Sequence, residues 1–264
     1  MKTASVQLDG PDRRFSAAGG TDLTTANGRP HRPPEAVRAL VQSARHDLED
    51  ATAEQIVAWA AQTFGDRLVV ASSMGDAVLV DLVSRLVPGV DVLFLDTGYH
   101  FPETIGIRDA VEVVYPVNVV SVRPELTVAE QDASFGRDLF ARDPDRCCAL
   151  RKVAPLRRAL TRYDAWLTGL RRADSPARAR TPVVQWDAQF EKVKVNPLAR
   201  WTDADVEAYV AAHGALVNPL RLDGYASVGC APCTARALDG NPRAGRWAGF
   251  AKNECGIHRP GAKQ

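Results

Sequence analysis

Five cysteines are the side chains of this chain best suited to covalent or metal chemistry, and they fall in three short motifs. RCCALRK holds Cys147 and Cys148, VGCAPCTAR holds Cys230 and Cys233, and ECGIH, near the end of the 264 residues, holds Cys255. The N-terminus lacks the charged and then apolar order of a secretory signal, which predicts a cytoplasmic protein. Because disulfides are not used as scaffolding in that compartment, the cysteines are predicted to be metal ligands or reactive groups.

The two cysteine pairs are predicted to share one metal centre. In CxxC the two sulfurs lie on one side of a turn, whereas the adjacent Cys147 and Cys148 diverge by about 100° unless their helix is distorted. Adjacent cysteines crowd a single zinc ion, while a 4Fe-4S cluster offers separate iron corners, so the spacing favours 4Fe-4S. Zinc, and four buried thiols without a ligand, remain the alternatives.

Three stretches carry groups suited to a small anion. ASSMGDA presents Ser72, Ser73 and Gly75 at a strand-to-helix turn, which suits phosphate or sulfate, although an ordinary turn with an N-cap serine is the commoner meaning. TGLRRADSPARAR and RAGRWAGFAK add guanidinium groups, which hold oxyanions through paired hydrogen bonds, or else form a solvated basic surface. The basic residues are Arg171, Arg172, Arg178, Arg180, Arg243, Arg246 and Lys252.

Short β-branched runs alternate with helical patterns along the chain, and this order positions the loops. The runs at 67–72, 91–96, 117–122 and 164–170 are predicted strands. The stretches at 33–50, 52–64, 73–87, 103–114 and 147–163 are predicted helices, the second with Thr52 as its N-cap. Such alternation implies an α/β fold with a parallel sheet flanked by helices, whose ligands bind at the carboxyl ends of the strands.

Composition narrows the class of protein. Thirty-three basic residues against 32 acidic ones leave a formal charge of +1, so neither nucleic acid nor a membrane is an expected partner. No apolar run is long enough to span a bilayer. Residues 1–34 are rich in Gly, Pro, Ser and Thr and are predicted to form a poorly ordered arm; 35–240 are predicted as the α/β domain with the cysteine pairs, and 241–264 as a mobile tail.

Four motifs taken together resemble one family of enzymes. CCALRKVAPL, LDTGYHFPET, SVGCAPCT and the terminal ECGIH are similar to those of the assimilatory adenylylsulfate (APS) and phosphoadenylylsulfate (PAPS) reductases, in particular the APS branch that carries a 4Fe-4S cluster. The resemblance runs from about residue 50 to the end. It implies the adenine-nucleotide α-hydrolase-like fold, a Rossmann-like arrangement with a modified P-loop (PP-loop), and makes 35–240 a nucleotide-binding domain.

The resemblance also assigns roles to residues. Cys147, Cys148, Cys230 and Cys233 correspond to the ligands of one 4Fe-4S cluster, and Cys255 to the nucleophile. Lys152 matches a lysine that lies between cluster and substrate. The remaining expected substrate-binding residues are Ser72, Ser73, Gly75, Arg171, Arg172, Arg243, Arg246 and His258, with His258 and the arginines also expected to favour the Cys255 thiolate. The contacts of Met74 and Asp76, where the loop departs from its relatives, stay open.

The implied reaction is the reduction of APS to sulfite and AMP, with thioredoxin as the reductant. Cys255 attacks the sulfonate sulfur and becomes a thiosulfonate, and because no spare cysteine remains in the chain, an external dithiol must reduce it. A terminal position lets the nucleophile close over the substrate and then reach thioredoxin. A PAPS reductase, an ATP-cleaving adenylyltransferase and an iron-sulfur or zinc redox sensor remain alternatives, and a homo-oligomer is compatible with the sequence.

Overall fold

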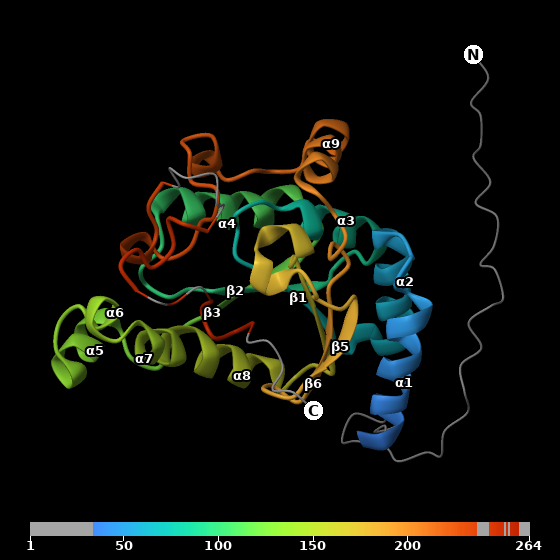
Figure 1. Ribbon diagram of the computed structural model, residues 1–264, viewed down its shortest axis with the longest axis horizontal. Helices are drawn as coiled ribbons and strands as arrows, with labels where there is room; N and C mark the ends of the chain where they lie inside the picture. Colours follow the sequence, from blue (N-terminus) through green and yellow to red (C-terminus); the bar gives the residue numbers. More distant parts are fainter. Residues whose placement is uncertain (1–33, 237–242, 251, 253, 259–264) are drawn as a thin grey trace. The chain divides into compact units, whose positions relative to one another are not determined.

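The computed structural model describes residues 34–236, 243–250, 252 and 254–258, and the chain divides into two compact units, residues 1–40 and 41–264 (Figure 1). The predicted N-terminal arm, apart from Pro34, lies outside the described residues. The domain boundaries predicted at residues 34 and 240 stay predictions. Among the described residues, no helix is both long and apolar enough to cross a membrane.

Nine α-helices and six strands are assigned in the part of the chain that the structure describes. The helices are α1 (Pro34–Asp47), α2 (Ala53–Phe64), α3 (Val78–Leu86), α4 (Pro102–Val114), α5 (Val128–Phe135), α6 (Leu139–Arg142), α7 (Pro144–Cys148), α8 (Ala154–Leu160) and α9 (Asp203–His213). The strands are β1 (Leu68–Ser72), β2 (Asp91–Leu95), β3 (Asn118–Val122), β4 (Ala165–Thr168), β5 (Val184–Asp187) and β6 (Lys192–Val195).

The strands form one sheet in the order β3-β2-β1-β4-β6-β5. All neighbouring pairs are parallel except β5 and β6, which are antiparallel and form one edge. The four strands predicted from β-branched runs correspond to β1, β2, β3 and β4, and the α/β class with a parallel sheet is confirmed. The pair β5–β6 was not predicted.

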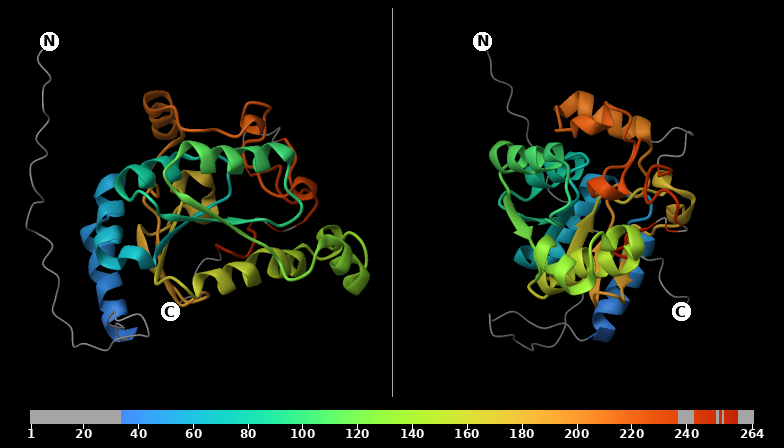
Figure 2. Two further views of the ribbon diagram at one scale, coloured as in Figure 1. Left: turned by 180° about the vertical axis from the view of Figure 1, so that it is seen from behind. Right: turned by 90° about the vertical axis from the view of Figure 1, so that its left-hand side faces the viewer.

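Helices cover both faces of this sheet, as buried parallel strands require. α2 and α3 pack on β1, α4 packs on β3, and α8 packs on β2 and β3 from the side opposite α4 (Figures 1 and 2). Val69, Leu93 and Trp166 are buried at the centre of the core between the sheet and α8. The N-cap predicted at Thr52 is present as a capping box with Gln55.

Candidate functional site

A cavity of about 550 Å³ lies at the carboxyl ends of β1, β2 and β4, and we call it the main cavity. Its walls include Ser73 after β1, Thr97 after β2 and Gly169 after β4. The strand order changes direction here, because β2 and β3 lie on one side of β1 and β4 lies on the other. Ligands of open α/β sheets bind at such a switch point, so the fold places a binding site where the sequence predicted one.

The loop after β1 faces the main cavity with Ser72, Ser73 and Gly75. Met74 in this loop is fully buried, has φ 57°, and donates its amide to Ser72 Oγ at 3.2 Å. A left-handed conformation in a non-glycine residue costs free energy and is typical of functional turns. α3 begins only at Val78, so the serines precede the helix and the reading of them as ordinary N-caps is wrong. Asp76, whose contacts the sequence left open, pairs with Arg221 at 3.0 Å.

Two arginines of the loop after β4 line the main cavity but are held by carboxylates. Arg171 pairs with Asp174 at 3.1 Å and with Asp203 at 2.8 Å. Arg178 donates two hydrogen bonds to Glu254, at 2.7 and 2.9 Å. Arg178 therefore ties the segment around Cys255 to this loop, in addition to any contact with an anion.

Arg172 does not belong to this site. It is absent from the cavity wall, and its guanidinium donates to the carbonyl of Thr181 at 2.9 Å and pairs with Glu49 at 2.7 Å. The prediction that Arg172 binds the substrate is wrong for this arrangement, and Arg180 of the same loop is exposed and also off the cavity wall.

Arg243 and Arg246 line the main cavity from the C-terminal region, as predicted. Arg246 is buried over the ring of Trp247, 4.5 Å from its centroid, and donates to Ser227 Oγ at 3.3 Å. A Cβ on Gly229 would overlap its guanidinium, so Arg246 would have to shift if this glycine were replaced. Aromatic packing and close backbone approach fix this cation in place.

The adjacent Cys147 and Cys148 lie at the end of α7, directly before a π-helical turn, Ala149–Val153, that leads into α8. Asp143 caps α7 by accepting from the amide of Arg146 at 2.9 Å. A π-helical turn widens the helix, and such turns are frequent at functional sites. The helix distortion that the adjacent pair requires is therefore present.

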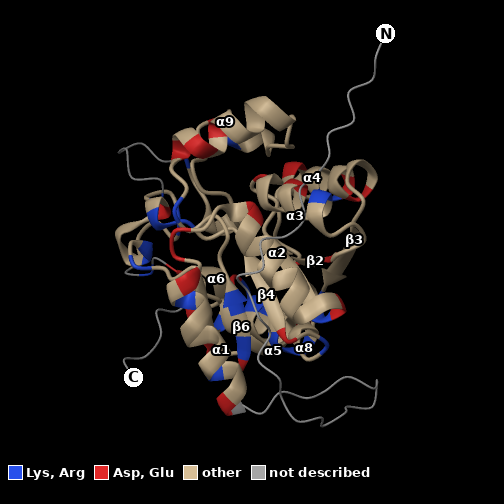
Figure 3. Cartoon of the chain, turned by 90° about the vertical axis from the view of Figure 1, so that its right-hand side faces the viewer, with Lys and Arg blue, Asp and Glu red and all other residues tan. Residues whose placement is uncertain are grey.

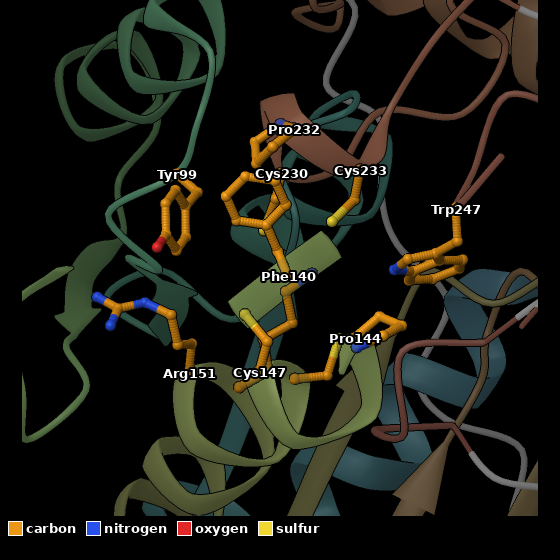
Figure 4. Close-up of a pocket in the computed structure, with 11 residues that line it drawn as sticks. Tyr99, Phe140, Pro144, Cys147, Arg151, Cys230, Pro232, Cys233 and Trp247 are labelled. Atoms are coloured by element: carbon orange, nitrogen blue, oxygen red, sulfur yellow. The ribbon is translucent and has the colours of Figure 1, made fainter. Parts of the chain in front are cut away.

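Cys230 and Cys233 lie on a turn that is bonded to the loop after β2. The amide of Ala231 donates to the Tyr99 carbonyl at 2.7 Å, and Thr97 Oγ1 lies 3.3 Å from Cys230 Sγ. Figure 4 shows the CxxC turn opposite Cys147 on its helix. All four paired cysteines line one small pocket, the thiol pocket, whose other walls are Tyr99, Phe140, Pro144, Arg151, Lys152, Pro232 and Trp247.

Burial and mutual repulsion dominate the electrostatics of the thiol pocket. Burial, reinforced by the three other paired thiols, raises the pKa of Cys147 to about 12, and burial raises the pKa of Cys148 to about 11. Burial also acts to raise the pKa of Cys230, but the Lys152 ammonium and the hydrogen bond with Thr97 outweigh it and lower that pKa. Crowded thiols of this kind are disfavoured as anions unless cations or a metal centre compensate them.

The thiol pocket matches the donor chemistry of an iron-sulfur cluster. Four cysteine sulfurs and no histidine or carboxylate line it, which is the usual ligand set of such clusters. Within the described ranges, no group of three or more His, Cys, Asp or Glu side chains is arranged to hold one metal ion. The sulfurs lie on opposite walls, from α7 and from the CxxC turn, which is compatible with a group that offers separate corners.

Lys152 and Trp247 line both the thiol pocket and the main cavity. Lys152 belongs to the π-helical turn, and its charge interacts with Cys230, Cys255 and Cys148. Burial acts to lower the pKa of Lys152, but these thiols outweigh it and raise the pKa, so the ammonium form is kept. Lys152 thus lies between the paired thiols and the main cavity, and its role toward a cluster and a substrate stays a prediction.

Cys255 lines the main cavity together with Ile257 and His258. The described residues 254–258 of the predicted tail are seated against the sheet rather than apart from it. Burial and the nearby charges of Lys194 and Arg178 hold the pKa of His258 well below its usual value, so the ring is neutral. The charges of Lys152, Lys194 and Arg243 interact with Cys255, and the expected contribution of His258 to the Cys255 thiolate stays a prediction.

Sequence reasoning missed several residues that shape the site. Trp247 was overlooked although its Arg-Trp pair lies within RAGRWAGFAK, and Thr97 although it lies within LDTGYHFPET. Lys194 and Gln189 come from the unpredicted β5–β6 edge and carry no motif. Only tertiary contacts bring them to residues 254–258.

Comparison with known proteins identifies relatives of this chain. The phosphoadenosine phosphosulfate reductase domain matches residues 67–236. A protein named adenosine 5'-phosphosulfate reductase from Streptomyces coelicolor is 62% identical over 228 residues, 86% of this chain and 97% of the relative. A protein of the same name from Mycolicibacterium smegmatis is 55% identical over 239 residues, covering 90% of this chain and 99% of the relative.

Solved structures extend the comparison to the fold. The PAPS reductase of Candida auris in a phosphate complex superposes with TM-score 0.64 at 28% identity, covering 74% of this chain and 96% of that one. The FMN adenylyltransferase of Candida glabrata superposes with TM-score 0.51 at 15% identity, covering 78% and 70%, which shows a shared fold only. The class is thus the adenine-nucleotide α-hydrolase-like fold, as predicted. The chain belongs to the phosphoadenosine phosphosulfate reductase family, within which its curated relatives are APS reductases.

Proposed function

We propose that this protein reduces APS to sulfite and AMP in sulfate assimilation. The observation that carries the proposal is the convergence of Cys255, Lys152 and Arg246 on one cavity that adjoins the four-thiol pocket. A sulfonate transfer needs a nucleophilic thiol and cations that offset the charge of the phosphosulfate, and both are present. The names of the curated relatives support APS as the substrate.

Cys255 is the proposed nucleophile. Its thiolate attacks the sulfonate sulfur of APS, a sulfur–sulfur bond forms, and the bond from that sulfur to the bridging oxygen breaks. The bond's electron pair leaves on the oxygen as AMP, whose negative charge Arg243 and Arg246 at the cavity wall are placed to offset. The enzyme is left with a thiosulfonate on Cys255.

A dithiol of the thioredoxin class is the proposed reductant. One thiolate attacks Cys255 Sγ and releases sulfite, and the second thiol resolves the mixed disulfide, so the two electrons come from the dithiol. The four other cysteines line the thiol pocket and are unsuited to this step if they are ligands. Residues 254–258 must leave the main cavity to expose the adduct to the partner.

One 4Fe-4S cluster is the proposed cofactor, with Cys147, Cys148, Cys230 and Cys233 as its ligands. When bound, the cluster contributes a compact negative charge beside the main cavity rather than a binding surface for the substrate. Lys152 touches both sites and offsets that charge on one side and the substrate's on the other. Four cysteine sulfurs gathered at one pocket from α7 and the CxxC turn support a metal group bound between them.

Substitution of Cys255 by serine tests the proposed function. Cys255→Ser is expected to bind APS and to keep its iron, but to lose turnover, because its oxygen is a poor nucleophile at neutral pH. Incubation of the wild type with APS and no reductant is expected to add one sulfonate group to the peptide with Cys255, and reduced thioredoxin to remove it as sulfite. Substantial turnover by the variant, or an adduct on another cysteine, would refute this assignment.

The choice between APS and PAPS is tested in the same assay. The proposed reductase is expected to turn over APS with a much higher kcat/KM than PAPS. The opposite preference would make the protein a PAPS reductase with the same thiol chemistry. Iron without turnover of either nucleotide would favour a redox sensor.

A further inference from the structure

The antiparallel edge of the sheet, β5–β6 with its connecting turn, contacts the segment that carries Cys255. Gln189 in the turn donates through Nε2 to the carbonyl of Gly256 at 2.8 Å. Ile257 packs into the core cluster that includes Phe190 and Trp166. The backbone of Gly256 and the side chain of Ile257 therefore both have partners on or beside this edge.

Lys194 of β6 contacts the last described residue of the segment, His258. Its side chain is only 2% exposed, and its Nζ lies 2.9 Å from His258 Nδ1. The ammonium also lies 4.8 Å from the centroid of the Trp166 ring and 4.0 Å from Asp187 Oδ2. Figure 3 shows the basic residues of β6 in blue. A buried ammonium group is costly without hydrogen-bond or charge partners, so these contacts stabilise the Lys194 side chain in its buried position.

His258 completes the arrangement from the segment's side. Its ring stacks on Trp166 with centroids 5.8 Å apart and planes 12° apart. A neutral imidazole has one acceptor nitrogen, and Nδ1 is the nitrogen that faces Lys194, so the lysine donates and the ring accepts. Stacking fixes the plane of the ring, and the lysine fixes which edge it presents.

At its other end, residue 254 anchors the segment. Glu254 accepts two hydrogen bonds from Arg178 and pairs with Arg243 at 3.3 Å. Cys255 lies between these two attachment points. Gly256, next to it, has φ 82°, a conformation that favours glycine and turns the chain sharply between them.

We propose that Lys194 is a positioning residue that seats His258 on Trp166 and so holds the Cys255 thiol in the main cavity. The inference rests on the proposed role of Cys255 as nucleophile, and it adds the β5–β6 edge as the docking surface for residues 254–258. When the segment leaves to meet the reductant, Lys194 loses its partner and remains buried beside Trp166 and Asp187. The lysine thereby favours the closed arrangement over the open one.

Lys194→Met tests the proposal, because methionine keeps much of the volume and removes the donor. Because trypsin does not cleave between Arg259 and Pro260, the tryptic peptide that carries Cys255 is 253–263; Cys255 is its single cysteine, so its alkylation by iodoacetamide can be followed by mass without activity. A hydrogen bond to a charged group corresponds to roughly ten-fold in an equilibrium, so alkylation in the resting holoenzyme is expected to be roughly ten-fold faster in the variant. Hydrogen exchange of the same peptide is expected to rise.

Lys194→Met is expected to change kcat and KM for APS to different extents. kcat for APS is expected to fall, because fewer bound complexes hold the thiol in line, while KM changes little, since Lys194 is not on the cavity wall. Lys194→Gln, which retains a donor, is expected to recover part of kcat. The matched control is Lys192→Met on the same strand, whose charge lies near Asp164, Arg67 and Glu191 instead, and which is expected to match the wild type.

The outcomes separate this proposal from the proposed function. Unchanged alkylation and exchange of peptide 253–263 in Lys194→Met, or equal effects in Lys192→Met, would overturn the positioning role whatever the activity. If alkylation and exchange rise but neither protein reduces APS, the docking surface stands and the proposed function fails. If Lys194→Met does not fold, Gln189→Leu removes a single, partly buried hydrogen bond to Gly256 and is expected to raise exchange of the same peptide.

Discussion

Replacement of Lys152 by methionine is the sharpest test of how the two pockets communicate. Lys152 lines both the main cavity and the thiol pocket, donates to Cys230, and interacts with the charge of Cys255. Methionine keeps the length of the side chain and removes the charge. The main loss is therefore electrostatic, with little change in packing.

The size of the effect follows from the number of charged contacts. A hydrogen bond to a charged group contributes about 1.5 to 3 kcal/mol, and the transition state has at least one such contact to lose, the one to the phosphosulfate. Loss of that contact lowers kcat/KM by roughly 10- to 150-fold, since each 1.36 kcal/mol is a factor of ten. Lys152→Arg is expected to restore only part of the rate, because a planar guanidinium needs more room than an ammonium.

The assay is steady-state reduction of APS by anaerobically purified enzyme, with iron per chain and the thermal midpoint measured on the same samples. Arg158→Met is the matched control, since Arg158 lies on α8 and pairs with Glu125 at the surface. Wild-type kcat/KM in a Lys152→Met enzyme that keeps its iron would refute the bridging role. Loss of iron in that variant would instead assign the lysine to the stability of the thiol pocket.

Three further expectations concern the thiol pocket, the C-terminal backbone and pH. Cys147→Ser is expected to lose iron and activity together, and one zinc and no iron in the wild type would contradict the cluster assignment. A Cβ on Gly245 would collide with the backbone carbonyl of Ala235, so Gly245→Ala is expected to lower APS affinity strongly. Gly106→Ala is the control, because a Cβ on Gly106 meets no atom within 4 Å. Burial lowers the pKa of Lys194 from 10.5 to about 8; the Asp187 carboxylate opposes this shift, the Arg178 charge adds to it, and His258 lies beside the ammonium. Between pH 8 and 10.5 the native state therefore binds fewer protons than the unfolded state. The thermal midpoint of the wild type, measured relative to Lys194→Met, is thus expected to rise from pH 8 to 10, and an unchanged difference would contradict the shift.

The sheet and the gathering of the paired cysteines were largely predictable because their signals are local. Val69 and Val70 in β1, and the run from Asp91 to Leu95 in β2, have the β-branched and apolar character of strands buried on both faces. The cysteine pairs carry their own spacing, and the π-helical turn after Cys148 meets a requirement that the adjacent pair already imposed. These properties depend on neighbours in the chain, so composition and periodicity reveal them.

The β5–β6 edge was missed for a physical reason. Lys192 and Lys194 alternate with valines, which is typical of a strand with one solvated face, yet Lys194 is almost fully buried. The ammonium is tolerated there because Trp166, Asp187 and His258 surround it, and each of these comes from a different segment. Sequence periodicity cannot report a burial that distant partners permit.

Residue types and their spacing were enough to predict the parallel sheet and to single out the five cysteines as candidate ligands or reactive groups, because each depends on chemistry carried within a few residues. The tertiary structure decides which charged side chains lie at the main cavity and which pair elsewhere. Arg172 turns to Glu49 and leaves it, Arg178 holds Glu254, and Lys194 meets His258 although 64 residues separate them. Such pairings follow from the strand order and the docking of the C-terminal residues, since ion pairs form between groups that packing brings together regardless of their distance along the chain.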